Sequence, residues 1–312
     1  FIQQIEEWNE SGNLVTAAAA VTDITLVSRA ASSTNAGDGA SSRPQILYVP
    51  NGGFTAPGTV GTIYIVYQSD ASDLVAGDTN GATDIFRTAV DLVSDAAGNL
   101  DLVINGNATA VSATNGTTNV GDGASTMAVV GGASANVVAF QSLATDLVAG
   151  FTDANGAGSA DIYLRNIGTN DTSLISHQTG NQATGGNGAS AVPAIDATGV
   201  GVAFASDATD LIASDTNAVR DVFYADVSGT APFSKVRASV TSAGDEGAGG
   251  ISADASIHVS GGGRTLVAFE SDKTDLAAGL VATTNVYLYD SDTGATTLLN
   301  QKLSSSLNEI GD

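Results

Sequence analysis

The chain lacks cysteine altogether, which excludes a disulfide framework and thiol chemistry. Basic residues are also scarce: 10 Lys and Arg stand against 33 Asp and Glu among 312 residues, a formal charge of -23. Nucleic acids and anionic lipids both require a Lys- and Arg-rich surface, so the composition argues against both partners. No run of 18 apolar residues occurs, and we therefore expect no membrane insertion. Aromatic residues make up only 5% of the chain.

What the chain does contain is a repeat. Four times, a strand-like run ends in an acidic turn and is followed by a second strand-like run, as in TIYIVYQSDASDLVAGDTNGATDIF and GVAFASDATDLIASDTNAVRDVF. An Asp-Leu pair anchors each copy, and its aspartates recur at intervals of 73, 64 and 65 residues: Asp73, Asp146, Asp210 and Asp275. Self-similarity at such a period indicates an array of one supersecondary unit.

Each unit is predicted to hold four strands. In the third copy we expect them at Ala191–Ile195, Val200–Ala205, Asp221–Ala225 and Ser234–Val240, because short apolar or alternating runs are bounded there by turn residues. A glycine-rich connector (AGDGAS, VGDGAS, GGNGAS) precedes each of the first three copies, and a weaker version precedes the fourth. Short strands, tight turns and small side chains are typical of β-propeller blades.

The sequence therefore predicts an all-β, propeller-like array of four-stranded antiparallel blades, with four full repeats and a partial one. We place the blades at about 39–118, 119–181, 182–243 and 244–305, within a repeat domain spanning 22–312. Residues 1–21 are predicted to form an N-terminal arm or a partial blade. Both 22–38 and 296–312 resemble an outer strand plus connector, and a closed ring would not need that element twice. We therefore expect either a segment of a longer chain or a ring with a partial fifth blade.

Three of the four turns carry an Asp-x-Asn pattern followed by a later aspartate. Carboxylate and amide oxygens on alternate residues of a turn suit Ca²⁺, which binds six to eight oxygen ligands. Two carboxylates per turn predict weak sites, suited to extracellular calcium. The predicted metal ligands are Asp78, Asn80 and Asp84 in the first turn, Asp153, Asn155 and Asp161 in the second, and Asp215, Asn217 and Asp221 in the third.

A purely structural interpretation of these turns remains open, because Asp and Asn also form turns and caps without metal. The fourth turn, which contains Leu280 and Asn285, has no carboxylate. The Asp-Leu pair persists in all four copies, so metal cannot explain it. We expect its aspartate to make a turn or cap hydrogen bond, and its leucine to fill the core between neighbouring units.

The segments VAFASDATDLIASDTNAVRDVFYAD and VYQSDASDLVAGDTNGATDIF resemble the repeats of WD40-like (TolB-type, PD40) β-propellers, which are common in secreted and surface proteins of bacteria. The resemblance covers about residues 22–312. It implies a propeller fold but not one activity, because that family includes scaffolds, peptide-binding modules and enzyme-attached domains.

Nothing in the sequence singles out a catalytic group. The two histidines, His177 and His258, have no counterpart in the other copies, and we expect surface or satisfied strand residues. The overall prediction is a non-catalytic, extracellular or cell-surface, calcium-binding protein with a structural or adhesive role in a surface layer, fibre or large adhesin. Its expected partners are copies of itself, as a possible homopolymer, or surface proteins and glycans. Two alternatives remain: a periplasmic or secreted protein-interaction propeller without metal, and a glycan-binding or glycan-cleaving propeller enzyme.

Overall fold

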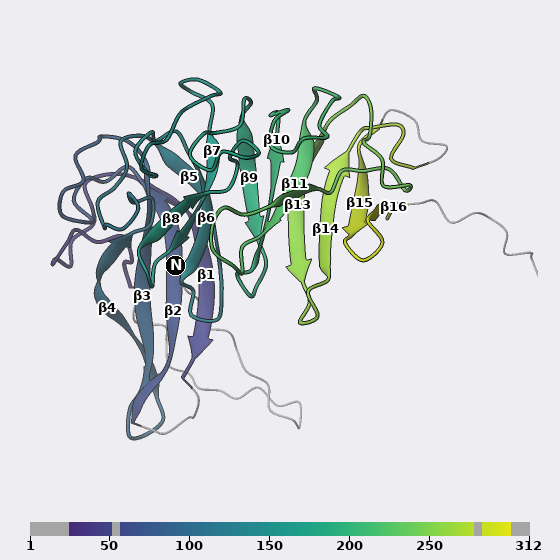
Figure 1. The fold of residues 1–312 in the computed structure, drawn as a ribbon. Coiled ribbons are helices and arrows are strands. Elements are labelled where there is room, and N and C mark those ends of the chain that lie inside the picture. Colours follow the sequence, from purple (N-terminus) through teal and green to yellow (C-terminus); the bar gives the residue numbers. More distant parts are fainter. Residues whose placement is uncertain (1–24, 52–56, 278–282, 301–312) are drawn as a thin grey trace, which may run out of the picture.

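A computed structural model describes residues 25–51, 57–277 and 283–300, and these residues form four antiparallel sheets of four strands each (Figure 1). Within every sheet, the strands pair in the order of the sequence. The described residues contain no helix, and so none that could cross a membrane. The predicted all-β array of four-stranded blades is confirmed. The expected partial blade or arm at 1–21 lies outside the described residues.

The first sheet is the longest. Its strands are β1 (Ser41–Pro50), β2 (Gly58–Ser69), β3 (Asp84–Ser94) and β4 (Leu100–Ala110). The second sheet comprises β5 (Ser125–Gly131), β6 (Val137–Ser142), β7 (Asp161–Asn166) and β8 (Asp171–Leu174).

The third sheet comprises β9 (Ser190–Ile195), β10 (Gly201–Ser206), β11 (Asp221–Asp226) and β12 (Lys235–Arg237). The fourth comprises β13 (Ser252–Val259), β14 (Thr265–Ser271), β15 (Asn285–Asp290) and β16 (Ala295–Leu298). β12 is shorter than the run 234–240 that the sequence predicts. Beyond Arg237, the chain turns so that the Ser239 hydroxyl reaches the Asp221 carboxylate.

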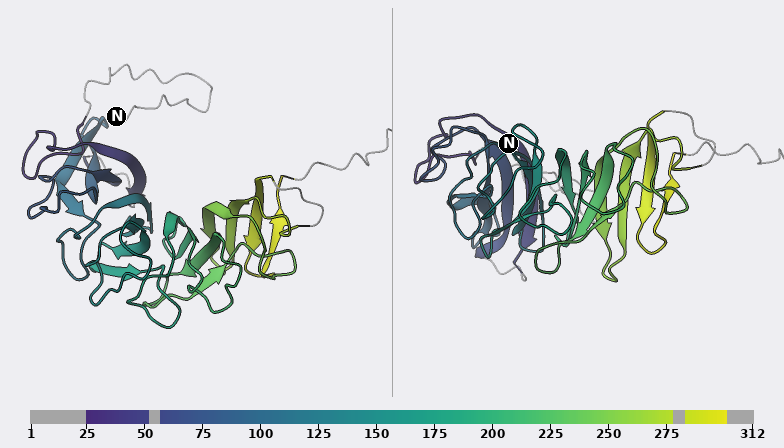
Figure 2. Two further views of the ribbon diagram at one scale, coloured as in Figure 1. Left: turned by 90° about the horizontal axis from the view of Figure 1, so that it is seen from above. Right: turned by 45° about the horizontal axis from the view of Figure 1, so that its top comes forward.

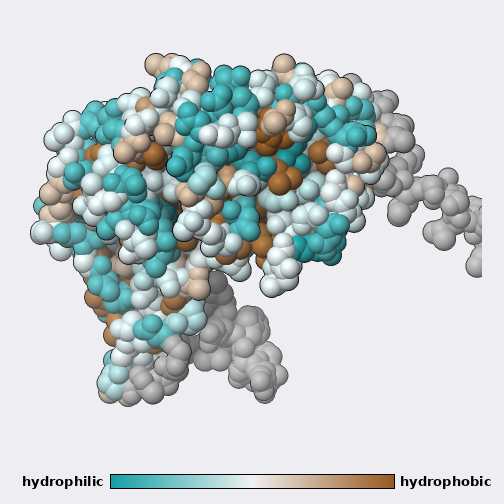
Figure 3. All heavy atoms as spheres, viewed as in Figure 1, coloured by the Kyte–Doolittle hydropathy of each residue, from teal (hydrophilic) through white to brown (hydrophobic). Residues whose placement is uncertain are grey.

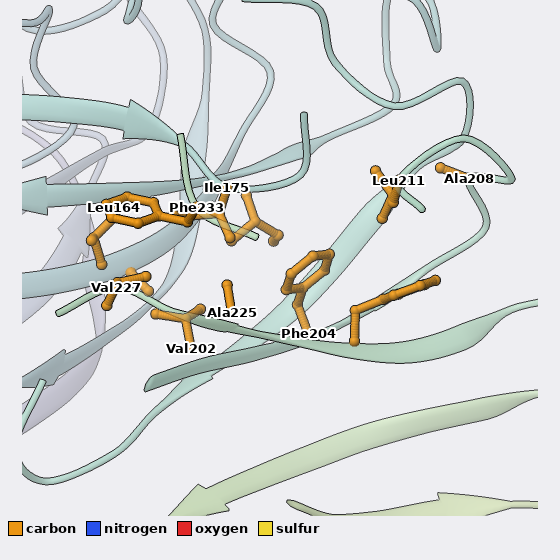
Figure 4. Close-up of a cluster of buried hydrophobic side chains, with 12 residues drawn as sticks. Leu164, Ile175, Val202, Phe204, Ala208, Leu211, Ala225, Val227 and Phe233 are labelled. Carbon is orange, nitrogen blue, oxygen red and sulfur yellow. The ribbon is translucent and has the colours of Figure 1, made fainter. Parts of the chain in front are cut away.

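Viewed from above, the sheets follow one another along an arc (Figure 2). Each sheet packs its second and third strands against the next sheet, and the hydrophobic core lies between sheets. Between the second and third sheets, Leu164 and Ile175 contact Val202, Phe204 and Phe233 (Figure 4). Equivalent clusters join the first sheet to the second and the third sheet to the fourth. Three clusters thus lie between neighbouring sheets, as expected of a repeat array, and a fourth packs the first sheet against Val27 and Val120.

The second and third strands of every sheet share one aromatic pair. The ring centroids are 6.2 Å apart in Tyr67–Phe86, 6.0 Å in Phe140–Tyr163, 6.0 Å in Phe204–Phe223 and 5.6 Å in Phe269–Tyr287. The few aromatic side chains are thus largely used at the blade cores. The face of the molecule in Figure 3 is correspondingly mostly hydrophilic or neutral, with scattered hydrophobic patches.

Candidate functional site

The acidic turns and the glycine-rich connectors meet at one edge of the array. Each first strand begins with a serine whose hydroxyl bonds to that of a serine ending the second strand. These pairs are Ser41–Ser69, Ser125–Ser142, Ser190–Ser206 and Ser252–Ser271, at 2.8–2.9 Å. Because the two strands are antiparallel, the connector that precedes the first strand and the turn that follows the second lie side by side. In Figure 1 this is the upper edge, where β13 begins and β14 ends.

The Asp-Leu pairs hold each turn to the connector of its own blade. The four aspartates accept backbone N–H groups of connector residues: Asp73 from Asp38 (2.9 Å), Asp146 from Asp122 (2.9 Å), Asp210 from Asn187 (2.9 Å) and Asp275 from Ala248 (2.6 Å). The leucines that follow them are at most 1% exposed. A Cβ on connector residue Gly121 would lie 2.7 Å from Leu147 Cδ2, so glycine permits this close packing. The predicted structural role of the pair is confirmed.

The last aspartate of each acidic turn begins the third strand and is buried. Asp84, Asp161 and Asp221 are 0–2% exposed. Each accepts a hydrogen bond from a serine hydroxyl beyond the fourth strand: Ser112 at 2.7 Å, Ser176 at 2.7 Å and Ser239 at 2.5 Å. These serines also accept the N–H of the residue that follows the aspartate. The hydroxyl is a neutral donor, as is the asparagine amide that also reaches each carboxylate, so the two compensate only partly for complete burial of the charge.

The asparagines bridge neighbouring blades. The Asn80 amide donates to Asp84 Oδ2 and to the Gly121 carbonyl, both at 2.7 Å, and Gly121 belongs to the next blade's connector. Asn217 does the same with Asp221 (3.0 Å) and Gly247 (2.7 Å), and Asn155 with Asp161 and Gly188 at 3.4 Å each.

The amide oxygens of these asparagines differ between the turns. Asn80 Oδ1 accepts the Ala82 N–H and Asn217 Oδ1 accepts the Val219 N–H, so both oxygens serve the turn itself. Asn155 Oδ1 is buried and has no hydrogen-bond partner. Sequence reasoning treated the three asparagines alike, whereas the structure leaves a free amide oxygen in the second turn.

The first aspartates also differ. Asp78 is 7% exposed, whereas Asp153 is exposed. Asp153 accepts the N–H groups of Asn155 and Gly156, and such hydrogen bonds close a turn without metal, as the structural interpretation of the sequence allowed. Asp215 is 8% exposed, and neither of its carboxylate oxygens has a hydrogen-bond partner.

Burial disfavours the ionised form of these carboxyl groups. It raises the pKa of Asp84 to about 6 and that of Asp161 to about 7. Burial also raises the pKa of Asp78, and burial together with the neighbouring Asp221 raises that of Asp215 to about 6. Near neutral pH, a cation beside these groups would therefore displace protons as well as gain ligands.

In the third turn, the protein itself supplies cations. Lys273 Nζ lies 2.5 Å from Asp221 Oδ1, and both side chains are fully buried. Arg237 Nη1 lies 2.5 Å from Glu246, 3.4 Å from Asp215 and 3.8 Å from Asp221. These three acidic residues offer oxygens within 4.8 Å of one another. The tightest carboxylate cluster among the described residues is thus partly neutralised by a guanidinium and an ammonium.

Sequence reasoning missed Arg237, Glu246 and Lys273. The repeat itself contained a clue to these residues. Lys273 follows the Ser-Asp of the fourth copy, at the position that is alanine in the first three copies: Ala71, Ala144 and Ala208. Arg237 likewise replaces Ala110 and Leu174. In a chain with 10 basic residues, two such replacements point to a local need for positive charge. In the first and second turns, the structure describes no ion pair to any of the four aspartates that sequence reasoning selected.

No protein-family model matches the chain, and no curated protein matches it. Solved structures do match. They include a thermostable family-43 glycoside hydrolase (11% identity, 85% of this chain and 93% of that one, TM-score 0.28). An α-L-arabinanase of Cellvibrio cellulosa complexed with arabinohexaose also matches (11%, 83% and 77%, TM-score 0.30), as does a structure described as a glycoside hydrolase (11%, 83% and 74%, TM-score 0.31).

These matches contradict the expectation that the chain is not an enzyme, because the proteins are glycoside hydrolases, and we withdraw that expectation. At this identity and these TM-scores they identify no substrate and no catalytic residue for the present chain. The four successive four-stranded antiparallel sheets establish its architecture as a propeller-like blade array.

Proposed function

We propose that this chain is a calcium-binding, propeller-type domain of a secreted or cell-surface protein. Ca²⁺ binds at the first and second acidic turns and joins each blade to the next. The array then presents its polar edge of turns and connectors to glycans, surface proteins or further copies. The proposal includes that the repeats are of the WD40-like propeller type that they resemble.

One observation carries the proposal: the three acidic turns are built alike, but among the described residues only the third has a Lys or Arg within ion-pair distance of its aspartates. At the third interface, Lys273 and Arg237 approach the buried Asp221. At the corresponding positions, the first interface has Ala144 and Ala110, and the second has Ala208 and Leu174. A fully buried carboxylate requires a compensating charge or a proton. A cation from solution would therefore stabilise the folded chain most at the first and second acidic turns.

The chemistry of the donors favours a hard cation. Carboxylate oxygens of Asp84 and Asp78, the free amide oxygen of Asn155, and backbone carbonyls of the connectors are oxygen ligands, and the chain has no cysteine. Few carboxylates per site favour weak binding, with Kd about 10⁻⁴–10⁻³ M, as is common for extracellular calcium modules. At 10 mM Ca²⁺, a site with Kd of about 1 mM would stabilise the fold by about 1.4 kcal/mol.

Calorimetry tests the proposal. We expect two equivalents of Ca²⁺ by titration at pH 7.5, and a higher melting temperature in 10 mM Ca²⁺ than in EGTA. Asp84→Asn and Asp161→Asn should each remove one equivalent, whereas Asp101→Asn, at an exposed aspartate of β4, should remove none. Equal melting temperatures of the unmodified protein in Ca²⁺ and in EGTA would overturn the proposal.

A second candidate function is glycan cleavage. It is favoured by carboxyl groups whose pKa is raised to about 6 (Asp84) and about 7 (Asp161), each on a turn with a second carboxyl group, Asp78 or Asp153. Glycoside hydrolases pair a carboxylic acid of raised pKa with an ionised carboxylate. The test is release of reducing sugar from arabinan, other polysaccharides and aryl glycosides, with Asp161→Asn and Asp84→Asn as the inactive variants. No release by the intact chain, with or without Ca²⁺, would reject this candidate.

A further inference from the structure

A basic pocket lies at the outer strand of the third sheet, beside residues 211–213, which lead into the third acidic turn. It encloses about 350 Å³ and is lined by His177, which follows β8, by Lys235 of β12, and by Thr179, Gly180, Leu211 and Phe233. Lys235 is 9% exposed and His177 is 5% exposed. Two basic side chains thus occur together in a chain of net charge -23.

The two side chains are in direct contact. Lys235 Nζ lies 3.2 Å from His177 Nδ1 and 3.0 Å from Nε2. In the ring plane, a point at that distance from both nitrogens would overlap Cε1, so Nζ lies over the face of the imidazole. The ring nitrogens themselves contact two backbone carbonyls, Gln178 O at 2.8 Å and Phe233 O at 3.1 Å. These carbonyls hold the ring edge-on, with the ammonium above it.

No carboxylate balances this pair. Among the described residues, none forms an ion pair with Lys235 or His177. Asp210 acts on Lys235 only through its charge, beyond ion-pair distance. Burial lowers the pKa of Lys235 to about 8 and also lowers the pKa of His177. A buried ammonium without a counter-charge is costly, and a bound anion would remove that cost.

We propose that the Lys235–His177 pocket binds a small carboxylate, with the carboxylate group on Lys235 Nζ and the carbon skeleton against Phe233 and Leu211. The ammonium supplies a charge-assisted hydrogen bond, and the Thr179 and Ser234 residues of the lining bring hydroxyl groups to the pocket. The strongly negative chain repels polyanions more than it repels a single charge, which favours a monoanion over a phosphate or a nucleic acid. Uronic acids and free small carboxylates share this chemistry.

The two histidines allow a site-specific test, because the chain contains only His177 and His258, and His258 is exposed on β13. Their ring C–H resonances can be assigned with His258→Gln and followed by NMR at constant ionic strength. Galacturonate, galactose and acetate are the three probes. Galacturonate and galactose have the same ring and differ in charge, and acetate carries the carboxylate alone.

We expect galacturonate to shift the His177 signals saturably, galactose to leave them unchanged, and His258 to respond to neither. A shift with acetate as well means that any small carboxylate suffices, and a shift with galacturonate alone assigns the uronic acid. Lys235→Gln should weaken binding about tenfold or more while the two histidine signals report an intact fold. An unmoved His177 signal with both anions, or an equal response to galactose, would overturn the proposal.

Discussion

Replacing Lys273 by methionine is the most informative perturbation of the blade interfaces. Methionine keeps most of the length of the side chain and removes the ammonium that lies 2.5 Å from Asp221 Oδ1. Both side chains are 0% exposed, so water cannot replace the lost partner without a local opening of the interface between the third and fourth sheets. Asp221 would retain the Ser239 hydroxyl at 2.5 Å, the Asn217 amide at 3.0 Å and Arg237 at 3.8 Å.

Removing one partner of a buried ion pair typically costs about 3–5 kcal/mol. Because Arg237 remains nearby, we expect Lys273→Met to lower the free energy of unfolding by about 3 kcal/mol, at the lower end of that range. Adding Asp221→Asn removes the stranded charge and should restore most of the loss, with a coupling energy of about 2 kcal/mol between the two positions. The third interface of Lys273→Met resembles the first two, so the variant should also become more dependent on Ca²⁺.

Urea denaturation followed by far-ultraviolet circular dichroism measures all three effects, in EGTA and in 10 mM Ca²⁺. Thr274→Ala, at the exposed residue next to Lys273, is a control for a neighbouring substitution that leaves the ion pair untouched. A loss below about 1 kcal/mol in Lys273→Met, together with unchanged calcium dependence, would refute the view that a cation is required at each acidic turn.

Three further predictions concern other parts of the array. In EGTA, the free energy of unfolding should fall as the pH rises from about 4 to 8. The folded-state pKa values of Asp84 and Asp161 are raised from the ordinary 3.8 to about 6 and 7. Within that window the folded state binds more protons than the unfolded state, so its stabilisation by protonation is lost as the pH rises. Melting scans should show the fall reduced in Ca²⁺, and a flat profile in EGTA would contradict the assignment. Gly188→Ala should lower the free energy of unfolding by at least about 1–3 kcal/mol, because the new Cβ would lie 2.5 Å from the Asp207 backbone. Gly229→Ala should be close to neutral, because no atom lies within 4 Å of its Cβ position. Equal urea midpoints of the two variants would contradict the close packing at Gly188. Leu147→Ala should cost about 2–5 kcal/mol in the same assay, since the side chain is fully buried between the first and second sheets, and a loss well below 1 kcal/mol would mean that it is not a core residue.

The sequence was sufficient for the fold because the information is local and repeated. Apolar runs such as Val200–Ala205, bounded by turns, can form only short strands. Four such units in tandem must pack against one another, because each needs a neighbour to bury its apolar surface. The Asp-Leu pair was interpretable for the same reason, since its persistence where no carboxylate follows excluded a metal role.

The site was less predictable because its partners come from different blades. Lys273 and Asp221 are 52 residues apart, and Asn80 and Gly121 are 41 apart. A pattern such as Asp-x-Asn shows which oxygens a turn carries, but not that the amide of Asn80 will reach the next connector, nor that Arg237 will enter the third cluster. Whether the chain is an enzyme could not be decided from the sequence for a related reason: a catalytic group is recognised by spatial convergence, which a one-dimensional spacing does not show.

The bridges made by Asn80, Asn155 and Asn217 all run in one direction, from a turn to a connector that is synthesised later. During translation, each blade would therefore leave the ribosome with its buried aspartate still uncovered, and would be completed only when a further 30 to 41 residues had emerged. The array is therefore completed from the amino end to the carboxyl end, because the connector of each blade covers the acidic turn of the blade before it. Truncation from the carboxyl end should accordingly leave an open acidic turn on the last remaining blade, whereas truncation from the amino end removes whole turns and exposes none.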